Sequence, residues 1–158
     1  MVAKTVEGGS ARERLLAAAA ELFYAEGVHT VGIDRVIERA GVAKASLYNV
    51  FGSKDELVKA YLADRQRVTR ARIEHGLQRY PTAREKLLGV FEIQGEVFAR
   101  PGFRGCAFIG ASSESPRPDG PVETAADEYR GWFRDLFLGL AREAGARRPE
   151  ELAKQLCL

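Results

Sequence analysis

The sequence of 158 residues predicts an all-α protein. Apolar side chains recur every three or four positions along most of the chain, and pairs of residues typical of helix starts precede several of these segments. No segment alternates apolar and polar residues as a strand does. An apolar fraction of 46% with 29% charged residues argues against a disordered chain. At this length we expect one compact unit or two small helical subdomains.

Three short helices are expected in the first third of the chain. Ser10 and Glu13 form a capping box, in which the serine hydroxyl accepts from a free amide and the glutamate reaches back, and Gly27 then ends the first helix. A second helix follows, and Gly41 can adopt the positive φ of a sharp turn into a third helix over about 43–51. The positions expected to face the core after the first helix are Ile33, Val36, Ile37, Ala40, Val42, Leu47 and Phe51.

A long helix is expected from the capping pair Ser53 and Glu56 to about residue 79, a length of roughly 39 Å at ~1.5 Å per residue. Thr82 and Glu85 then begin a helix over about 83–99, which is apolar around much of its circumference and is therefore expected to be buried. We interpret the arginines in the middle of the long helix as a solvated face; they are Arg65, Arg67, Arg70 and Arg72.

The last third of the chain begins with an uncharged segment, 105–113, which predicts a short internal helix. The prolines and glycine of "SPRPDGP" predict a loop, and Pro121 begins a strongly patterned helix that stops near Gly145. A last helix begins at Pro149 and ends in apolar residues without a polar cap. Either this helix is buried against a partner or the chain stops short of a longer design, and we expect the second.

Composition favours a cytoplasmic protein. No stretch approaches the ~18 apolar residues of a membrane span, and residues 1–10 read as a flexible arm without a secretory pattern. The cysteines, Cys106 and Cys157, lack CxxC spacing and fit a reducing compartment. The formal charge of +2, and seven basic against six acidic side chains in residues 1–54, do not indicate a polybasic binder. A nucleic-acid function must therefore rest on where particular residues lie.

Signs of an enzyme are absent from the sequence. His29 and His75 have no companions at metal-ligand spacing, and there is no GxSxG motif, glycine-rich phosphate loop or repeated acid pair. We therefore expect no catalytic residues, no metal site and no cofactor.

The helix, glycine turn and helix around Gly41 have the spacing of a helix-turn-helix. Because the apolar positions face inward, the third helix has an outer face whose side chains could enter a major groove; these are Lys44, Ala45, Ser46, Tyr48 and Asn49. Lysine suits guanine or phosphate, asparagine an adenine edge, and the tyrosine hydroxyl a phosphate. Lys54, at the start of the next helix, could also hold a phosphate. The spacing alone leaves open that Tyr48 only covers surface.

The segment "AGVAKASLYNVFGSKDEL", with "GVHTVGIDRVIERAG" before it, resembles the amino-terminal domain of the tetracycline-repressor (TetR) family of bacterial transcription regulators. The resemblance covers roughly residues 11–60, and the later helices match the family only in layout. The matching residues are Ala40, Gly41, Val42, Lys44, Leu47, Tyr48, Phe51, Ser53, Lys54 and Leu57.

Three positions depart from the family pattern. Ala43 stands where a serine often caps the recognition helix, which weakens the start of that helix by ~1 kcal/mol. Ala45 replaces a common glycine. Val31 stands where a threonine usually contacts phosphate, and Thr30, one position earlier, is the candidate for that contact.

The resemblance implies a homodimer that reads a palindromic operator in double-stranded DNA and releases it when a small apolar or aromatic effector binds. Residues 1–54 would form the DNA-binding domain, and residues 55–158 would bind the effector and dimerise. The candidates for lining the effector site are Phe91, Ile93, Phe98, Phe103, Cys106, Phe108, Ile109, Tyr129 and Phe133. For each of them plain core packing is the alternative. The alternative function is an all-α carrier or interaction module that does not use its first three helices on DNA.

Overall fold

The computed structural model describes residues 9–114 and 120–157, and the regular structure in these ranges is helical, as the sequence predicts. The expected arm, most of the "SPRPDGP" loop and Leu158 lie outside the described residues. The chain forms two compact units: the first comprises Met1–Arg65 with Cys106–Ala125, and the second Gln66–Gly105 with Ala126–Leu158. The predicted boundary between residues 54 and 55 separates DNA binding from effector binding and dimerisation, not one compact unit from another, and it stays a prediction.

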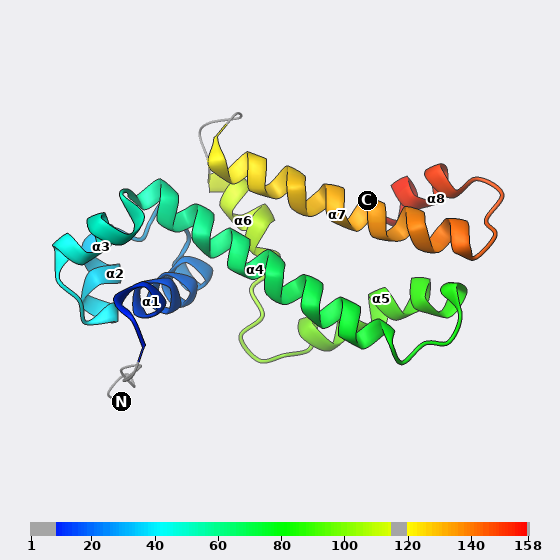
Figure 1. Ribbon diagram of the computed structural model, residues 1–158, viewed down its shortest axis with the longest axis horizontal. Helices are drawn as coiled ribbons and strands as arrows, with labels where there is room; N and C mark the ends of the chain where they lie inside the picture. The colour runs from blue at the N-terminus through cyan, green and yellow to red at the C-terminus, as the bar shows by residue number, and fades with distance from the viewer. Residues whose placement is uncertain (1–8, 115–119, 158) are drawn as a thin grey trace. The chain divides into compact units, whose positions relative to one another are not determined.

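The first unit begins with three helices that lie together: α1 (Ala11–Glu26), α2 (Ile33–Ala40) and α3 (Lys44–Phe51) (Figure 1). The capping box at the start of α1 is confirmed. The amide of Glu13 donates to Ser10 Oγ at 3.3 Å, and the amide of Ser10 donates to Glu13 Oε2 at 2.8 Å. The amide and the hydroxyl of Ser10 both donate to the Glu13 carboxylate, and these two hydrogen bonds lower the pKa of Glu13, because they favour its ionised form. Gly27 ends α1 with a φ of 96°.

The turn between α2 and α3 depends on Gly41, whose φ of 62° and ψ of 43° lie in the left-handed region. Its amide returns to the carbonyls of Glu38 and Ile37, which closes the end of α2. The guanidinium of Arg14, on α1, donates to the Gly41 carbonyl at 3.1 Å. The turn that orients α3 is therefore held both by its own backbone and from α1.

The core of the first unit is built by α1, α2, α3 and the first half of α4 (Lys54–Leu77). The ring of Phe23 meets that of Tyr61 edge to face, with centroids 5.7 Å apart. Seven of its side chains are completely buried: Leu15, Ala19, Val31, Val36, Leu47, Leu57 and Leu62. Of the other inward positions predicted for α2 and α3, Ala40 is buried and Ile33, Ile37, Val42 and Phe51 are half-buried.

The capping pair at the start of α4 forms only in part. Ser53 Oγ accepts from the amide of Glu56 at 3.1 Å. The carboxylate of Glu56 instead pairs with Lys59 Nζ at 2.7 Å, one turn further along α4. The helix ends at Leu77, and the amides of Gln78 and Arg79 close the following turn on carbonyls three residues back.

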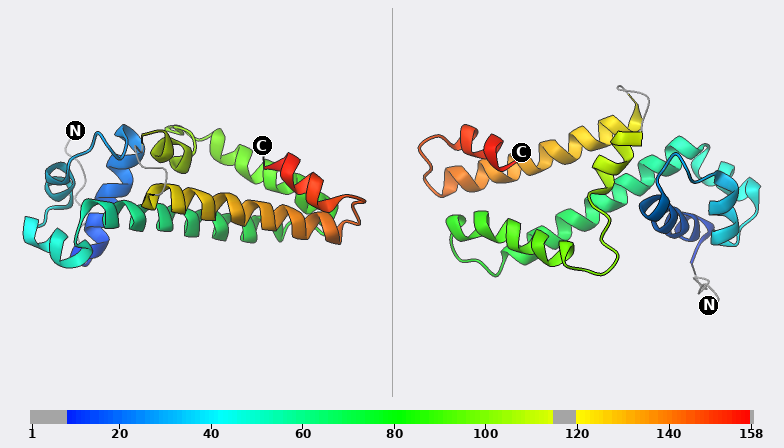
Figure 2. Two further views of the ribbon diagram at one scale, coloured as in Figure 1. Left: turned by 90° about the horizontal axis from the view of Figure 1, so that it is seen from above. Right: turned by 180° about the vertical axis from the view of Figure 1, so that it is seen from behind.

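The second unit packs α5 (Ala83–Phe98), α8 (Pro149–Leu156) and the second halves of α4 and α7 (Pro121–Glu143) around one core. The capping box of Thr82 and Glu85 begins α5, and Pro149 occupies the first turn of α8, as predicted. Figure 2 shows α8 folding back beside the end of α7. The buried core residues are Ile73, Leu77, Val90, Ile93, Phe137, Leu140 and Ala153.

Two of the expected burials are wrong in part. Val90 and Ile93 of α5 are buried, but on the other side of this helix Leu88, Phe91 and Phe98 are 61%, 48% and 57% exposed. The short helix α6 (Ala107–Glu114) buries Phe108, yet Ile109 is 68% exposed. An apolar helix surface is buried only where another element packs on it, and periodicity does not say how many sides are covered.

The arginines in the middle of α4 are not a simple solvated face. Arg67 is exposed, whereas Arg65, Arg70 and Arg72 are half-buried. Within the first unit the guanidinium of Arg65 lies 4.3 Å from the ring centroid of Tyr24. The long apolar stem and flat guanidinium of arginine can lie along aromatic rings, and this explains the burial.

Membrane-spanning segments were sought along the described helices, and none of them combines the length and the apolar character that a span needs.

The start of α3 generates a stability prediction. Ala43 occupies the N-cap position with a φ of −71° and a ψ of 150°, and no side chain caps the helix there. Ala43→Ser would supply a hydroxyl acceptor for the free amides of the first turn, so we expect the free energy of unfolding to rise by ~1 kcal/mol in urea titrations. Ala45→Ser, at the second residue of α3 instead of its N-cap, is the matched control and should not raise the free energy of unfolding. Equal stability of Ala43→Ser and the unaltered protein would contradict this account of the cap.

Candidate nucleic-acid interface

The outer face of α3 is set by the contrast between neighbouring residues. Leu47 is completely buried, whereas Tyr48, the next residue, is 47% exposed. Asn49, Lys44 and Ala45 are also exposed. Ser46 is half-buried, and its amide closes the first turn of the helix on the carbonyl of residue 43 at 2.9 Å. Four of the five residues predicted to face the groove are thus accessible on α3, and Ser46 is only partly so.

Lys44 is held at the edge of this face by α2. Its Nζ donates to Asp34 Oδ1 at 3.0 Å, and the two side chains are 62% and 82% exposed. The hydrogen bond to Asp34 raises the pKa of Lys44, and the charge of that carboxylate adds to the effect. A pair this exposed contributes little to stability, so its lysine can exchange Asp34 for another anion at small cost. Sequence reasoning did not identify Asp34; its spacing of ten residues from Lys44 crosses the turn.

Thr30 and Lys54 lie at a second part of the same unit. Thr30 is exposed in the turn between α1 and α2. Lys54 is half-buried, and its Nζ lies 3.4 Å from the carbonyl oxygen of His29 in that turn. Burial lowers the pKa of Lys54, although the charges of Asp55 and Glu114 oppose this. The first residue of α4 is therefore tied to the turn that carries Thr30, rather than extended into solvent.

Glu114, at the end of α6, holds the same turn and was not found from the sequence. Its Oε2 accepts from the amide of His29 at 2.9 Å, across 85 positions of the chain. The carboxylate also occupies the space beside Gly27, where any Cβ would overlap it. The positive φ of Gly27 favours glycine at this position, and a Cβ there would displace the Glu114 carboxylate from its place beside the turn. In the sequence Glu114 is a single acidic residue after the uncharged segment 105–113, and nothing in that pattern predicts a contact with the turn at His29.

The nine residues predicted to line an effector site are divided between the two units. Cys106, Phe108 and Ile109 belong to the first unit, and Phe91, Ile93, Phe98, Phe103, Tyr129 and Phe133 belong to the second. Of the second group, Ile93 is in the core and the others are half-buried or exposed.

Aromatic rings of the second unit form a continuous series along α7, which sequence reasoning had assigned only in part. Tyr129 and Phe133 meet edge to face at 5.2 Å, Trp132 and Phe133 at 4.6 Å, and Phe133 stacks on Phe137 at 6.1 Å between centroids. Phe91, from α5, stacks on Phe137 at 5.5 Å. Trp132 and Phe137, which are not among the residues predicted to line an effector site, therefore contact three that are: Phe91, Tyr129 and Phe133.

Histidine, cysteine and acidic side chains do not gather in groups of three or more suited to a metal ion within residues 9–114 and 120–157. Cys106 is half-buried and Cys157 exposed, and both are free thiols.

Comparison with known proteins matches residues 15–61 to the family model described as bacterial regulatory proteins, tetR family. The crystal structure of SCO4454, a TetR-family transcriptional regulator from Streptomyces coelicolor, is 39% identical and superposes with a TM-score of 0.86, covering 91% of this chain and 76% of that one. The TetR-family regulator CifR, solved as a cysteine mutant with 26-base-pair operator DNA, is 27% identical with a TM-score of 0.78, covering 92% and 81% of the two chains.

A curated relative matches a shorter part of the chain. The transcriptional activator FasR of Mycolicibacterium smegmatis is 50% identical over 51 residues, which are 32% of this chain and 23% of FasR. The chain thus spans under two thirds of the length of this relative. The relatives are transcriptional regulators and not enzymes. With an identity of 39% over three quarters of SCO4454 and a family match that coincides with the helix-turn-helix, the chain belongs to the TetR family of bacterial transcriptional regulators.

Proposed function

We propose that this protein is a cytoplasmic, homodimeric repressor that binds a palindromic operator through α3 and is released by a small apolar or aromatic effector. The observation that carries the DNA-binding part is the orientation of α3, with Leu47 completely buried and Tyr48 47% exposed beside it. This orientation supports presenting Lys44, Tyr48 and Asn49 to base edges and phosphates.

In the proposed complex two protomers place their α3 helices in successive major grooves, about 34–36 Å apart, so that the protein dyad matches the palindrome. α4 is one uninterrupted helix whose first half belongs to the first unit and whose second half belongs to the second. An effector that prefers one position of α4 would change the separation of the two α3 helices and mismatch the grooves. The aromatic series on α7 supports an apolar or aromatic effector.

The first test is selection of bound duplexes from a random pool, which should yield an inverted repeat. On that duplex we expect Lys44→Ala and Tyr48→Ala each to weaken binding by about tenfold, because each removes one contact to phosphate or base. Fluorescence anisotropy at several salt concentrations measures the affinity, and Lys44→Ala should also reduce the salt slope by about one.

Lys59→Ala is the matched control for these substitutions, because Lys59 is an exposed lysine of the same unit that pairs with Glu56. It should leave operator affinity unchanged. An operator affinity unaffected by Lys44→Ala and Tyr48→Ala together would remove α3 from the interface, and a protein without any salt-dependent DNA affinity would favour a carrier function.

The pair between Asp34 and Lys44 gives a prediction of opposite sign. Asp34→Asn removes a negative charge from beside the proposed phosphate contacts and frees Lys44, so operator affinity should rise by about threefold at low salt and less at high salt. Glu56→Gln, which frees Lys59 in the same way, is the control. Weaker binding by Asp34→Asn would show that DNA binding needs Asp34 to position Lys44.

Glu114 should matter for the turn that carries Thr30. Glu114→Ala removes the acceptor for the His29 amide, and we expect the free energy of unfolding to fall by ~1 kcal/mol and operator affinity to fall with it. Glu114→Gln keeps an acceptor oxygen and should lie between Glu114→Ala and the unaltered protein. Urea titration and anisotropy measure the two effects, and unchanged values for Glu114→Ala would mean that the turn holds without α6.

A further inference from the structure

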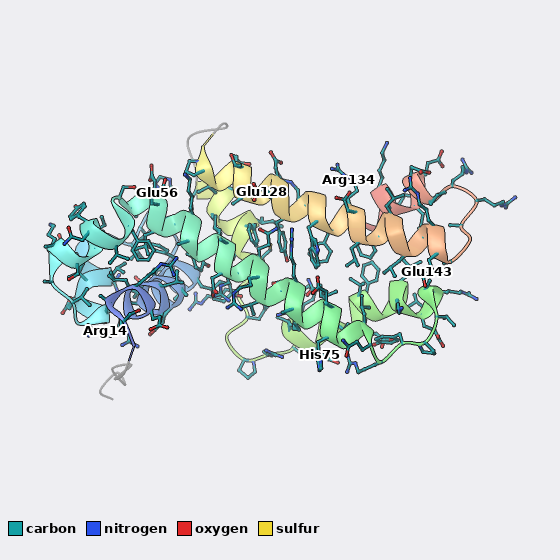
Figure 3. The ribbon with its side chains drawn as sticks, viewed as in Figure 1. Arg14, Glu56, His75, Glu128, Arg134 and Glu143 are labelled. Carbon is teal, nitrogen blue, oxygen red and sulfur yellow. The ribbon has the colours of Figure 1, made fainter. Side chains whose placement is uncertain are left out.

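An exposed pair of opposite charge joins the first turns of α2 and α3. Lys44 is the first residue of α3, and its Nζ lies 3.0 Å from Oδ1 of Asp34, in the first turn of α2. The two side chains are 62% and 82% exposed. Figure 3 shows side chains with nitrogen or oxygen ends projecting outward from α2 and α3. The amine and the carboxylate therefore lie side by side where another molecule can reach them.

The backbone that carries the two side chains is held in place. Gly41, in the turn between the helices, has a left-handed φ of 62°. Its carbonyl accepts from the guanidinium of Arg14, which Figure 3 labels on α1. Leu47, three residues after Lys44, is completely buried. The ion pair itself contributes little to stability at such an exposed place, so a role in holding the fold does not account for it.

The two side chains offer opposite hydrogen-bonding groups at one fixed spacing. The ammonium group of a lysine has three donors and no acceptor, whereas an ionised carboxylate has acceptors alone. The hydrogen bond to Asp34 raises the pKa of Lys44, which keeps the amine charged. Because Nζ has three donors, Lys44 can keep its bond to Asp34 while it donates to further acceptors.

The edge of a G·C base pair in the major groove carries a matching row of groups. Guanine presents two acceptors, N7 and O6, and cytosine presents the N4 amino donor beside them. Cytosine N4 donates to guanine O6 within the base pair, so these two atoms are about 3 Å apart. The distance of 3.0 Å between Nζ and Oδ1 thus suits donation by Lys44 to guanine together with acceptance by Asp34 from cytosine.

An A·T pair matches the two side chains less well in either orientation. Its row of groups is the N7 acceptor and N6 donor of adenine, followed by the O4 acceptor and the methyl group of thymine. A carboxylate that accepts from N6 then faces a neighbouring acceptor, either O4 or N7, and the lysine finds one acceptor instead of two. The carboxylate of Asp34 therefore favours cytosine and also disfavours an A·T pair.

We propose that Asp34 and Lys44 together recognise one G·C base pair in each operator half-site, with guanine bound by Lys44 and cytosine by Asp34. The proposal rests on the DNA-binding function proposed above and deepens it, because it names a base pair and the two atoms that contact it. Asp34, an acidic residue on a surface that meets a polyanion, is then a specificity-determining residue.

The test uses the full chain and the selected duplex, with each base pair of a half-site replaced in turn and affinity measured by anisotropy. We expect one position at which G·C binds at least about tenfold more tightly than A·T. This preference should persist as salt is raised, because base contacts release few counterions. Asp34→Ala and Lys44→Ala should each reduce it to about threefold or less. Asp34→Asn, whose amide both accepts and donates, should bind the A·T duplex with a smaller penalty than the unaltered protein.

Two altered bases at that position separate the two contacts. N4-methylcytosine has a methyl group in place of the amino hydrogen that faces the groove, and 7-deazaguanine lacks the N7 acceptor. Each should weaken binding of the unaltered protein by about fivefold, since each removes one hydrogen bond. Asp34→Ala should not respond to N4-methylcytosine, and Lys44→Ala should not respond to 7-deazaguanine.

Glu21→Ala is the matched control, because it removes the carboxylate that pairs with Arg39 of α2, and it should keep the G·C preference. Circular dichroism establishes that each variant is folded. The proposal is overturned if no G·C preference depends on both Asp34 and Lys44, or if the altered bases leave binding of the unaltered protein unchanged. A selected inverted repeat without such a position rejects this proposal alone, whereas failure to select any duplex rejects the DNA-binding function with it.

Discussion

The burial of Leu47 is the constraint on which the surface of the first unit depends. α3 has only eight residues and no side-chain cap, so its intrinsic helical stability is low and packing decides its orientation. Leu47 is completely buried, and rotating α3 to expose it would lose roughly 1.5–3 kcal/mol of hydrophobic stabilisation. The left-handed turn at Gly41, fastened to α1 by Arg14, brings α3 to this position. The accessibility of Tyr48 and Asn49 follows from those two features.

Surface charges of the first unit are arranged in exposed pairs rather than in a basic patch. Arg35 pairs with Glu26 and Lys44 with Asp34 at exposed positions, and the half-buried Arg39 pairs with the exposed Glu21. Such pairs are weak in water and can be exchanged for phosphates without large cost. Residues 1–54, whose net charge is near zero, can thus bind a polyanion, provided that a few cationic side chains are correctly placed.

The arginines of α4 and the turn after it lie in two kinds of environment in the second unit. Arg70 and Arg72 are half-buried beside aromatic rings and an amide, while Arg79 is paired with Glu96 at the surface. A ring face and an amide oxygen accommodate these two guanidinium groups without a carboxylate, because the flat group can lie along a ring and donate to an amide.

The sequence by itself determined the helices, two of the three predicted capping boxes and the burial of Leu47 on α3. Capping boxes, the glycine turns and the spacing of apolar residues act within a few positions of the chain, and for that reason Ser10, Gly41 and Leu47 could be interpreted correctly. Only the tertiary structure decided that Glu114 holds the turn at His29, that Arg70 lies on Trp132, and that one side of α5 is exposed. Each of these depends on which distant elements meet, and apolar periodicity shows that a helix can pack without showing what packs on it.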